Sequence, residues 1–360
     1  MKPEDYFSKI KLNTSEQQTG MLRAGKYAEL AAAVHSLKGD LLQPNQMKRL
    51  VEAGELSETL ALLTKGSATV EGDDVTAAES YLTLRVITLV RRLAAYTPDD
   101  CRPLIKLFLM GYELACVKEM LGAIINKVDL GEAVRQIVPA GRFTLERCKT
   151  LIEAHEPNRV IAALDNEGLK SFLAPRVGDF SSEATAAMAI DQYYYRKLWA
   201  MSDLPDTIDT RSARALIGKA VDHLNILSAL RARLAGLDVK STLDLLIPVD
   251  YRLGDALKQL AESTSIHNLI RIVERTEYAE AVHGITGVDG DLAKVERAFC
   301  RSHLKSCVNV FAGSPFNIGL ALAFLFMKNY ELRDLFTIIN GKANNVASQR
   351  VLDALILPSM

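Results

Sequence analysis

The chain repeats the same three markers three times, in one order and at an almost constant spacing. The first marker is an acidic residue followed by apolar residues at helical spacing: Glu113, Asp222 and Glu331, where the interval from 113 to 222 equals the interval from 222 to 331. The second is a short phrase of the type Leu-Ile-Glu-Ala, at 50–53, 151–154 and 260–263. The third is an aliphatic residue followed by proline, at Val138-Pro139, Ile247-Pro248 and Leu357-Pro358. Such recurrence indicates triplication of one structural unit, so a threefold pseudo-symmetric molecule is expected.

Helical periodicity dominates the chain from Tyr27 onward. Apolar residues recur at i, i+3, i+4 and i+7, and period-two alternation is scarce, which predicts an all-α fold. We divide the chain into a polar N-terminal arm (1–20), unit 1 with an opening helix (21–135), unit 2 (136–245) and unit 3 (246–360). The arm is expected to be loose or ordered only by a partner. Because no flexible linker separates the units, we expect one rigid body.

Composition excludes several classes of function. The formal net charge is −1, with both signs mixed along the chain, so there is no global attraction to nucleic acid. The longest apolar run, 319–327, is about half of the roughly 20 residues that span a bilayer, and the start of the chain resembles no secretory signal. The five cysteines form no C-x-x-C pair, which is typical of buried thiols in a reducing cytosol.

Several residue groups suggest chemistry, but their spacing argues against it. Threefold symmetry would hold Glu113, Asp222 and Glu331 far apart, so no catalytic pair is predicted. Cys300 and Cys307 flank His303 on one helix face, yet they lie about 10 Å apart along the helix axis, too far to bind one zinc ion. The run 193–199 mixes aromatic and basic residues, but consecutive aromatics point around a helix and form no stacking platform. Gly341-Lys342 lacks the upstream glycine of a phosphate-binding loop. No cofactor, metal, nucleic acid or small-molecule substrate is therefore expected.

The residues at the C-terminal end resemble a known family. Pro315-Phe316 leads through Met-Lys-Asn-Tyr-Glu-Leu-Arg-Asp-Leu at 327–335 to Ile-Ile-Asn-Gly-Lys at 338–342, and the middle unit carries Asp-His-Leu-Asn-Ile at 222–226. These motifs, with 191–194 and the opening helix at 33–42, resemble the C subunit, also called d, of the V-type and archaeal A-type rotary ATPases. The resemblance spans essentially Tyr27 to Met360. The chain differs from the family at Cys116, which stands where unit 2 has Asn225, and at Asp334, where asparagine is more typical.

The resemblance implies a non-catalytic rotor part. Family members consist of three similar all-helical units that form a funnel. The funnel sits on the membrane ring of proteolipid subunits and receives the central stalk in its mouth. The resemblance therefore implies a funnel-like single body that is peripheral to the membrane on its cytoplasmic face. Its partners would be the central-stalk subunits and the proteolipid ring, and it would transmit torque during ion translocation coupled to ATP synthesis or hydrolysis.

Candidate partner-binding residues are the polar residues of the repeated helices. We expect them to line the inner surface and to orient the stalk, or else to serve only as packing residues and cavity-lining groups. The set is Glu113, Asp222, Asn225, Arg231, Arg233, Glu331, Arg333 and Lys342. The basic residues near the helix ends, Arg231, Arg233 and Lys342, could instead stabilise the helix dipole.

Two other classes of function remain open. A helical-repeat adaptor would bind other soluble proteins, although its repeats are typically 34 to 47 residues long and stack openly, whereas the period seen here is more than twice as long and favours closure about an axis. A helical enzyme with an unrecognised site would need converging titratable groups that the sequence does not show.

Overall fold

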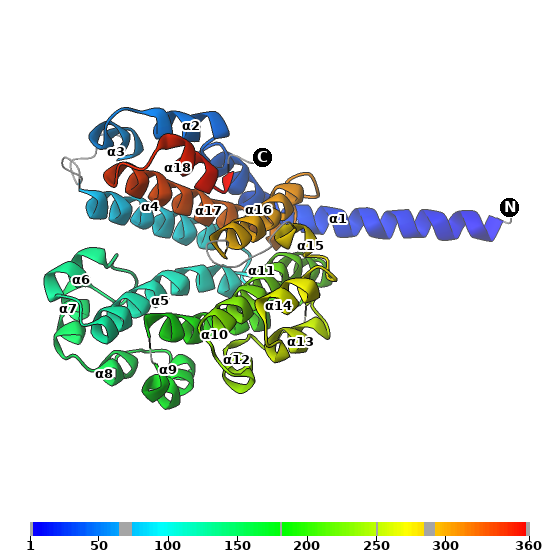
Figure 1. The fold of residues 1–360 in the computed structure, drawn as a ribbon. Helices are drawn as coiled ribbons and strands as arrows, with labels where there is room; N and C mark the ends of the chain where they lie inside the picture. Colours follow the sequence, from blue (N-terminus) through cyan, green and yellow to red (C-terminus); the bar gives the residue numbers. More distant parts are fainter. Residues whose placement is uncertain (1–2, 65–73, 181, 250, 284–291, 358–360) are drawn as a thin grey trace.

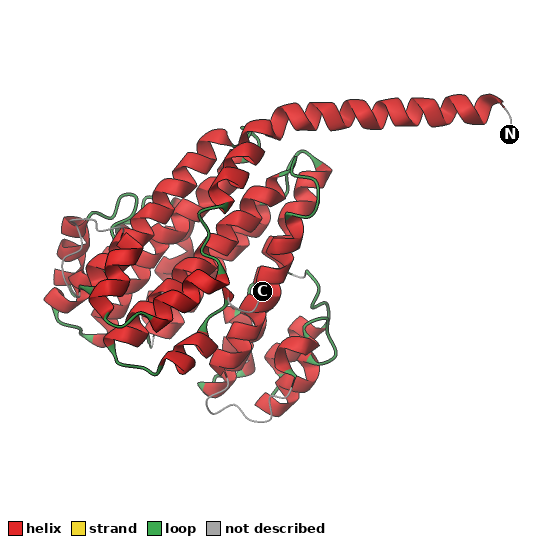
Figure 2. Ribbon diagram, turned by 90° about the horizontal axis from the view of Figure 1, so that it is seen from above, coloured by secondary structure: helices red, strands yellow, loops and turns green. Residues whose placement is uncertain are grey.

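The computed structural model describes residues 3–64, 74–180, 182–249, 251–283 and 292–357. The regular structure of these residues is helical, without strands, which confirms the all-α prediction (Figure 2). In chain order the helices are α1 (Pro3–Lys38), α2 (Pro44–Glu52), α3 (Leu56–Thr64), α4 (Val75–Tyr96), α5 (Arg102–Asn126), α6 (Leu130–Gln136), α7 (Leu145–Glu153), α8 (Pro157–Ala162), α9 (Glu167–Leu173), the 3₁₀ helix η1 (Ala174–Asp179), α10 (Glu183–Met201), α11 (Thr207–Leu234), α12 (Val239–Leu245), α13 (Ala256–Glu262), α14 (Ile266–Val273), α15 (Ala279–Val282), α16 (Leu292–Val310), α17 (Ile318–Ala343) and α18 (Ser348–Ala354).

The long helices form a closed cycle of contacts. In the order α4, α5, α10, α11, α16 and α17, each helix packs against the next, and α17 packs back against α4 (Figure 1). Helix α11 also packs against α17. Each pair, α4–α5, α10–α11 and α16–α17, contributes one third of this cycle. The funnel shape stays a prediction.

Short helices cover the cycle of long helices. The repeated Leu-Ile-Glu-Ala phrase lies at the end of a short helix in all three cases. Helices α6 to α9 follow α5, and α12 to α15 follow α11. The phrase at 151–154 ends α7 and that at 260–263 ends α13, whereas the phrase at 50–53 ends α2, which packs against α17 and α18. The first short helices of the chain therefore cover its last long helix. The unit boundaries near 135 and 245 stay predictions.

The long second helices of the three pairs end in the same backbone motif. Lys127, Gly236 and Asn345 all have left-handed backbone, with φ of 54°, 70° and 53°, and they recur at the interval that separates the repeated acids. The next N–H reaches back to a carbonyl of the last turn in each case, as in a Schellman motif: Val128 to Ala123 at 2.9 Å, Leu237 to Ala232 at 2.9 Å and Val346 to Gly341 at 2.8 Å. The repeat in the sequence is thus a repeat in hydrogen bonding.

The N-terminal arm is helical from residue 3 onward. Residues 3–20, expected to be loose or partner-ordered, form the first part of helix α1, which projects from the rest of the molecule (Figures 1 and 2). Pro358, in the third aliphatic–proline marker, lies outside the described residues. None of the helices within the described residues has the length and hydropathy that crossing a bilayer requires.

Candidate functional site

The repeated acidic residues each bind the backbone of an incoming loop. Glu113 on α5, Asp222 on α11 and Glu331 on α17 each accept an N–H from a residue that lies two to four positions before the start of a short helix. The donors are Arg142 before α7, Arg252 before α13 at 2.9 Å and Leu42 before α2 at 2.6 Å. A carboxylate at the same repeated position therefore holds a loop in all three cases. The loop held by Glu331 comes from the start of the chain.

These acids differ in burial. Asp222 is 0% exposed and Glu331 is 2% exposed, and Asp222 also accepts the hydroxyl of Tyr278 at 2.7 Å. Burial raises the pKa of Glu113, and the neighbouring Arg142 opposes this rise. Gly141 approaches Glu113 so closely that an added Cβ would lie 1.6 Å from its carboxylate, and its φ is +57°. These contacts fit carboxylates that tie loops to long helices.

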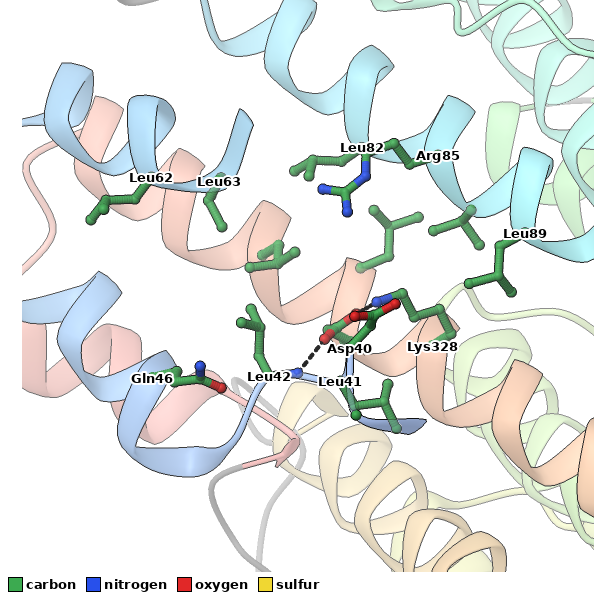
Figure 3. Close-up of a pocket in the computed structure, with 15 residues that line it drawn as sticks. Asp40, Leu41, Leu42, Gln46, Leu62, Leu63, Leu82, Arg85, Leu89 and Lys328 are labelled. Atoms are coloured by element: carbon green, nitrogen blue, oxygen red, sulfur yellow. Dashed lines mark hydrogen bonds and ion pairs between the residues drawn. The ribbon is translucent and has the colours of Figure 1, made fainter. Parts of the chain in front are cut away.

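Two of the acids line separate cavities. The cavity at Glu331 has a volume of about 310 Å³ and lies between α3, α4, α17 and the loop after α1. Figure 3 shows leucine side chains around it, with Arg85 and Lys328 directed toward its centre. Lys328 forms an ion pair with Glu331. The cavity at Glu113 has a volume of about 230 Å³. These two cavities share no carboxylate, so Glu113 and Glu331 do not meet in one site.

A second repeated position ties the same helices to the aliphatic–proline markers. Cys116 Sγ donates to the carbonyl of Val138 at 2.9 Å. Asn225, which is 0% exposed, both accepts from the Ile247 N–H at 2.8 Å and donates to the Ile247 carbonyl at 3.0 Å.

Asp334 completes the set by accepting the N–H groups of Ile356 and Leu357, each at 2.8 Å. Burial raises the Asp334 pKa to about 6, although both N–H groups oppose the rise. A cysteine thiol can donate a hydrogen bond, a side-chain amide can both donate and accept, and a carboxylate can accept. Cys116, Asn225 and Asp334 thus make a contact at the same repeated position but bind different backbone groups.

The predicted basic residues occupy three different environments. Arg231 and Arg333 both pair with Glu296 of α16, at 2.7 and 2.6 Å, and their side chains are 38% and 51% exposed. Arg233 donates to the carbonyl of Leu237, three residues past the end of α11, at 2.9 Å. Lys342 donates to the carbonyl of Ala53, just after α2. Of these residues, only Arg231 and Arg333, in the cluster Arg231–Glu296–Arg333, combine an ion pair with substantial exposure.

Acidic residues at one equivalent position also hold the three pairs of long helices together. Asn340 of α17 donates to Glu79 of α4 at 2.6 Å, and Lys118 of α5 pairs with Asp191 of α10. The equivalent contact between α11 and α16 is the Arg231–Glu296 pair already described. Each junction between consecutive pairs therefore carries a polar contact at this equivalent position.

A further polar site, which no sequence motif indicated, lies where α1 meets the starts of the long helices. Asp209 of α11 is 0% exposed. It accepts hydrogen bonds from Arg23 Nη2 at 3.0 Å and from the Tyr27 hydroxyl at 2.6 Å. The N–H of Ile318, the first residue of α17, also donates to Asp209 at 3.1 Å.

Helix α1 extends this contact to all three pairs. Arg23 donates to the carbonyl of Phe316, just before α17, at 3.2 and 3.0 Å, and Lys26 pairs with Asp100, just before α5, at 2.7 Å. Asp100, Asp209 and Ile318 are separated by the repeat interval. This spacing was the sequence signal that could have indicated that the three positions are equivalent. Arg23 and Lys26 belong to no repeat, so nothing in the sequence pointed to them. Helix α1 therefore joins the N-terminal ends of α5, α11 and α17.

Of the residues considered for metal binding, His303 and Cys307 are buried and Cys300 is partly buried. His303 is 0% exposed and bonds the Tyr330 hydroxyl at 2.7 Å and the Leu216 carbonyl at 3.0 Å. Burial lowers its pKa to about 4. Within the part of the chain that the structure describes, no three His, Cys, Asp or Glu side chains are arranged to hold a metal ion.

Comparison with known proteins agrees with the resemblance seen in the sequence. The family model described as ATP synthase (C/AC39) subunit matches residues 30–353. The A-type ATP synthase C subunit of Methanosphaera stadtmanae is 26% identical over 340 residues, which cover 90% of this chain and 86% of that protein. Its counterpart in Methanocaldococcus jannaschii is 23% identical over 349 residues, covering 92% and 86%. The counterpart in Methanosarcina mazei is 22% identical over 343 residues, covering 93% and 94%. The chain belongs to the ATP synthase (C/AC39) subunit family.

Proposed function

We propose that the chain is the central-rotor coupling subunit of an A/V-type rotary ATPase. In this role it links the membrane proteolipid ring to the central stalk and transmits torque during ion translocation coupled to ATP synthesis or hydrolysis. It acts without a catalytic site or cofactor, as a peripheral protein on the cytoplasmic face of the membrane. The observation that carries the proposal is the family match over residues 30–353.

The packing supports a part that transmits torque. A coupling body must turn without bending, and protein interiors packed to crystal-like density deform little. The long helices contact one another in a closed cycle, with a polar tie at each junction between pairs. Helix α1 crosses the starts of α5, α11 and α17 and joins them. These contacts favour one body over hinged domains.

The candidate residues divide into two groups in this proposal. Arg231 and Arg333 are exposed enough to reach a partner. Asp222, Asn225 and Glu331 are buried and bonded to backbone, so they would act by shaping the surface. Glu113, which lines its own cavity, and Arg233 and Lys342, which bind backbone carbonyls, would belong to this second group.

The first test is recovery of the complex from membranes. Tagged full-length protein would be purified from detergent-solubilised membranes of its source, and the proteins recovered with it would be identified by mass spectrometry. Proteolipid ring and central-stalk subunits in a fixed ratio are expected. Recovery of unrelated soluble proteins instead would support the helical-repeat adaptor.

A paired variant tests the exposed cluster. Arg333→Ala should reduce recovery of the stalk subunits, because it removes an exposed charge from the proposed contact. Arg271→Ala, on α14, removes an exposed arginine outside that cluster and should leave recovery unchanged. Equal recovery from both variants would remove Arg333 from the contact surface and leave the family assignment intact.

A further inference from the structure

A cleft of about 610 Å³ lies between α15, α16 and α18. One wall is a face of α16 that carries a row of cations. The row is Lys294, Arg297, Arg301 and Lys305, at steps of three and four residues, which place all four on one helix face. Ala298 and Ser302 lie between them on the same face, and their small side chains leave room above the helix. The wall thus combines positive charge with open space.

Arg301 has a donor without a partner. Its Nη2 donates to the carbonyl of Leu355, at the end of α18, at 2.6 Å. Its Nε is buried and has no hydrogen-bond partner among the described residues. Burial lowers the pKa of Arg301 and the adjacent charge of Arg297 lowers it further, whereas Asp334 and Asp353 partly oppose this fall. An anion in the cleft beside these two guanidinium groups would relieve their mutual repulsion through charge-assisted hydrogen bonds, which are stronger than neutral ones.

The opposite wall carries carboxylates, and these narrow the ligand class. Glu277 is already paired with Arg252 at 2.9 Å, and Asp353 accepts a hydrogen bond from Gln349 at 2.8 Å. Glu280 also lines the cleft. A bare polyanion would be repelled by this wall. A phosphate ester that also carries hydroxyl or ammonium donors would match both walls.

We propose that this cleft binds a phosphate ester, with the phosphate on Arg297, Arg301 and Lys305 and its hydroxyl or ammonium donors toward Glu280 and Asp353. The same chemistry is found in soluble phosphate esters and in the headgroups of phospholipids. The cleft and the Arg231–Glu296–Arg333 cluster of the proposed coupling role both use α16 but share no residue, and the proposed site does not depend on that role.

The test compares two double variants of the full-length protein. Arg297→Gln/Lys305→Gln removes two cations of the cleft and leaves the Arg301–Leu355 contact in place. Lys258→Gln/Arg271→Gln removes two exposed cations of α13 and α14 and is the matched control. Isothermal titration calorimetry would measure binding of phosphoethanolamine in a low-salt, phosphate-free buffer. Flotation would measure binding to vesicles of phosphatidylethanolamine with phosphatidylglycerol, against vesicles of phosphatidylcholine alone.

The expected result is binding that weakens at least tenfold in the cleft variant and stays unchanged in the control variant. If phosphoethanolamine binds and the vesicles do not, the ligand is a soluble phosphate ester. If the vesicles bind and phosphoethanolamine competes, the ligand is a lipid headgroup. The proposal is overturned if neither probe binds wild-type protein, or if both double variants lose binding equally, since that outcome would reflect net charge alone.

Discussion

Asp209 is a single carboxylate on which three helices depend. It is 0% exposed and receives donors from α1 and from the start of α17. Burial raises the pKa of Tyr27, and its hydrogen bond to Asp209 adds to the rise, so the phenol stays protonated and donates. Burying a charge is costly unless it is paired and hydrogen-bonded. The arrangement is therefore stable only while its donors remain.

Replacing Arg23 with alanine should expose this dependence. Arg23→Ala removes the closest cation from a fully buried carboxylate, which typically costs about 3–5 kcal/mol. We expect a loss of about 3 kcal/mol, at the lower end of this range, because Lys26 Nζ still lies 3.7 Å from the Asp209 carboxylate. Urea denaturation would measure the change in the free energy of unfolding. Lys48→Ala, which breaks an exposed pair with Glu52, should cost less than about 1 kcal/mol. Similar losses in the two variants would contradict a special role for Arg23.

The buried imidazole of His303 predicts a pH dependence of stability. Its pKa is lowered from 6.5 to about 4 in the folded protein, chiefly by burial. The unfolded chain therefore binds more protons between these two values. The contribution of His303 to stability is complete above about pH 6.5 and is lost as pH falls toward about 4. Across this window the contribution amounts to up to about 3 kcal/mol.

His303→Gln isolates this contribution. The raised pKa of Asp334 acts in the opposite direction near pH 4–6, because a carboxyl that holds its proton in the folded state gains stability as pH falls. His223, also buried with a lowered pKa, acts in the same direction as His303. The Asp334 effect is common to wild type and variant. Burial, the largest cause of the lowered His223 pKa, also remains in the variant, and only the smaller contribution of the neighbouring His303 is lost. The difference between the unfolding free energies of wild type and variant should therefore shrink from pH 7 to pH 4. A difference that does not change with pH would exclude titration of His303.

At the element scale, the ends of the long helices show that the repeat fixes the backbone conformation more closely than the side chain at a given position. The left-handed residues Lys127, Gly236 and Asn345 recur at one constant interval, and so do the positions two residues further on. Asp129 caps α6 and Asp238 caps α12 with their side chains, whereas Ala347 stands at the same place before α18 and makes no cap bond. Its backbone, with φ −54° and ψ 133°, closely resembles that of Asp129, with φ −57° and ψ 139°.

Ala347→Asp should therefore stabilise the protein. The new carboxylate would accept an N–H in the first turn of α18, as Asp129 does in α6, and such caps contribute about 1 kcal/mol. Thermal unfolding would report a higher midpoint. Asp129→Ala is the mirror variant and should lower the midpoint by a comparable amount. No gain from Ala347→Asp alongside a loss from Asp129→Ala would mean that α18 is held by packing alone.

Helix type and order could be predicted from the sequence because both depend on local periodicity. The markers identified equivalent positions, since Cys116, Asn225 and Asp334 each reach the residue 22 positions ahead. The burial of the polar side chains could not be predicted. A polar residue on a repeated helix gives the same sequence pattern whether its side chain lines a surface or binds backbone. The covering of α17 by α2 was equally inaccessible, as was the Arg23–Asp209 contact across 186 residues. No local pattern specifies which distant segment supplies a partner.

At the scale of the whole molecule, the two ends of the chain complete one unit. Helices α2 and α3 pack against α17, and α1 packs against both α4 and α17. The largest cluster of buried apolar residues accordingly contains side chains from both ends, among them Leu30, Met47 and Phe324. Residues 74–360 alone would expose the part of this core that the first helices cover.

Co-expression of two fragments tests this interdependence. Fragments 1–64 and 74–360 should co-purify and recover the native helical circular dichroism, because burial of the shared core drives their association. Fragment 1–64 carrying Arg23→Ala should bind more weakly, since Asp209 would lose its cation. If fragment 74–360 alone unfolded with the stability of the intact chain, the shared core would be dispensable.

The hydrogen bond from Leu42 to Glu331 joins residues 289 positions apart in the sequence. This separation affects folding during synthesis on the ribosome. At 5–20 residues per second, synthesis of the intervening chain takes about 15–60 s. During that time the apolar faces of α2 and α3 have emerged while their docking site on α17 does not yet exist. The nascent chain must shield those faces until translation is nearly finished, so the first segment made is among the last to fold.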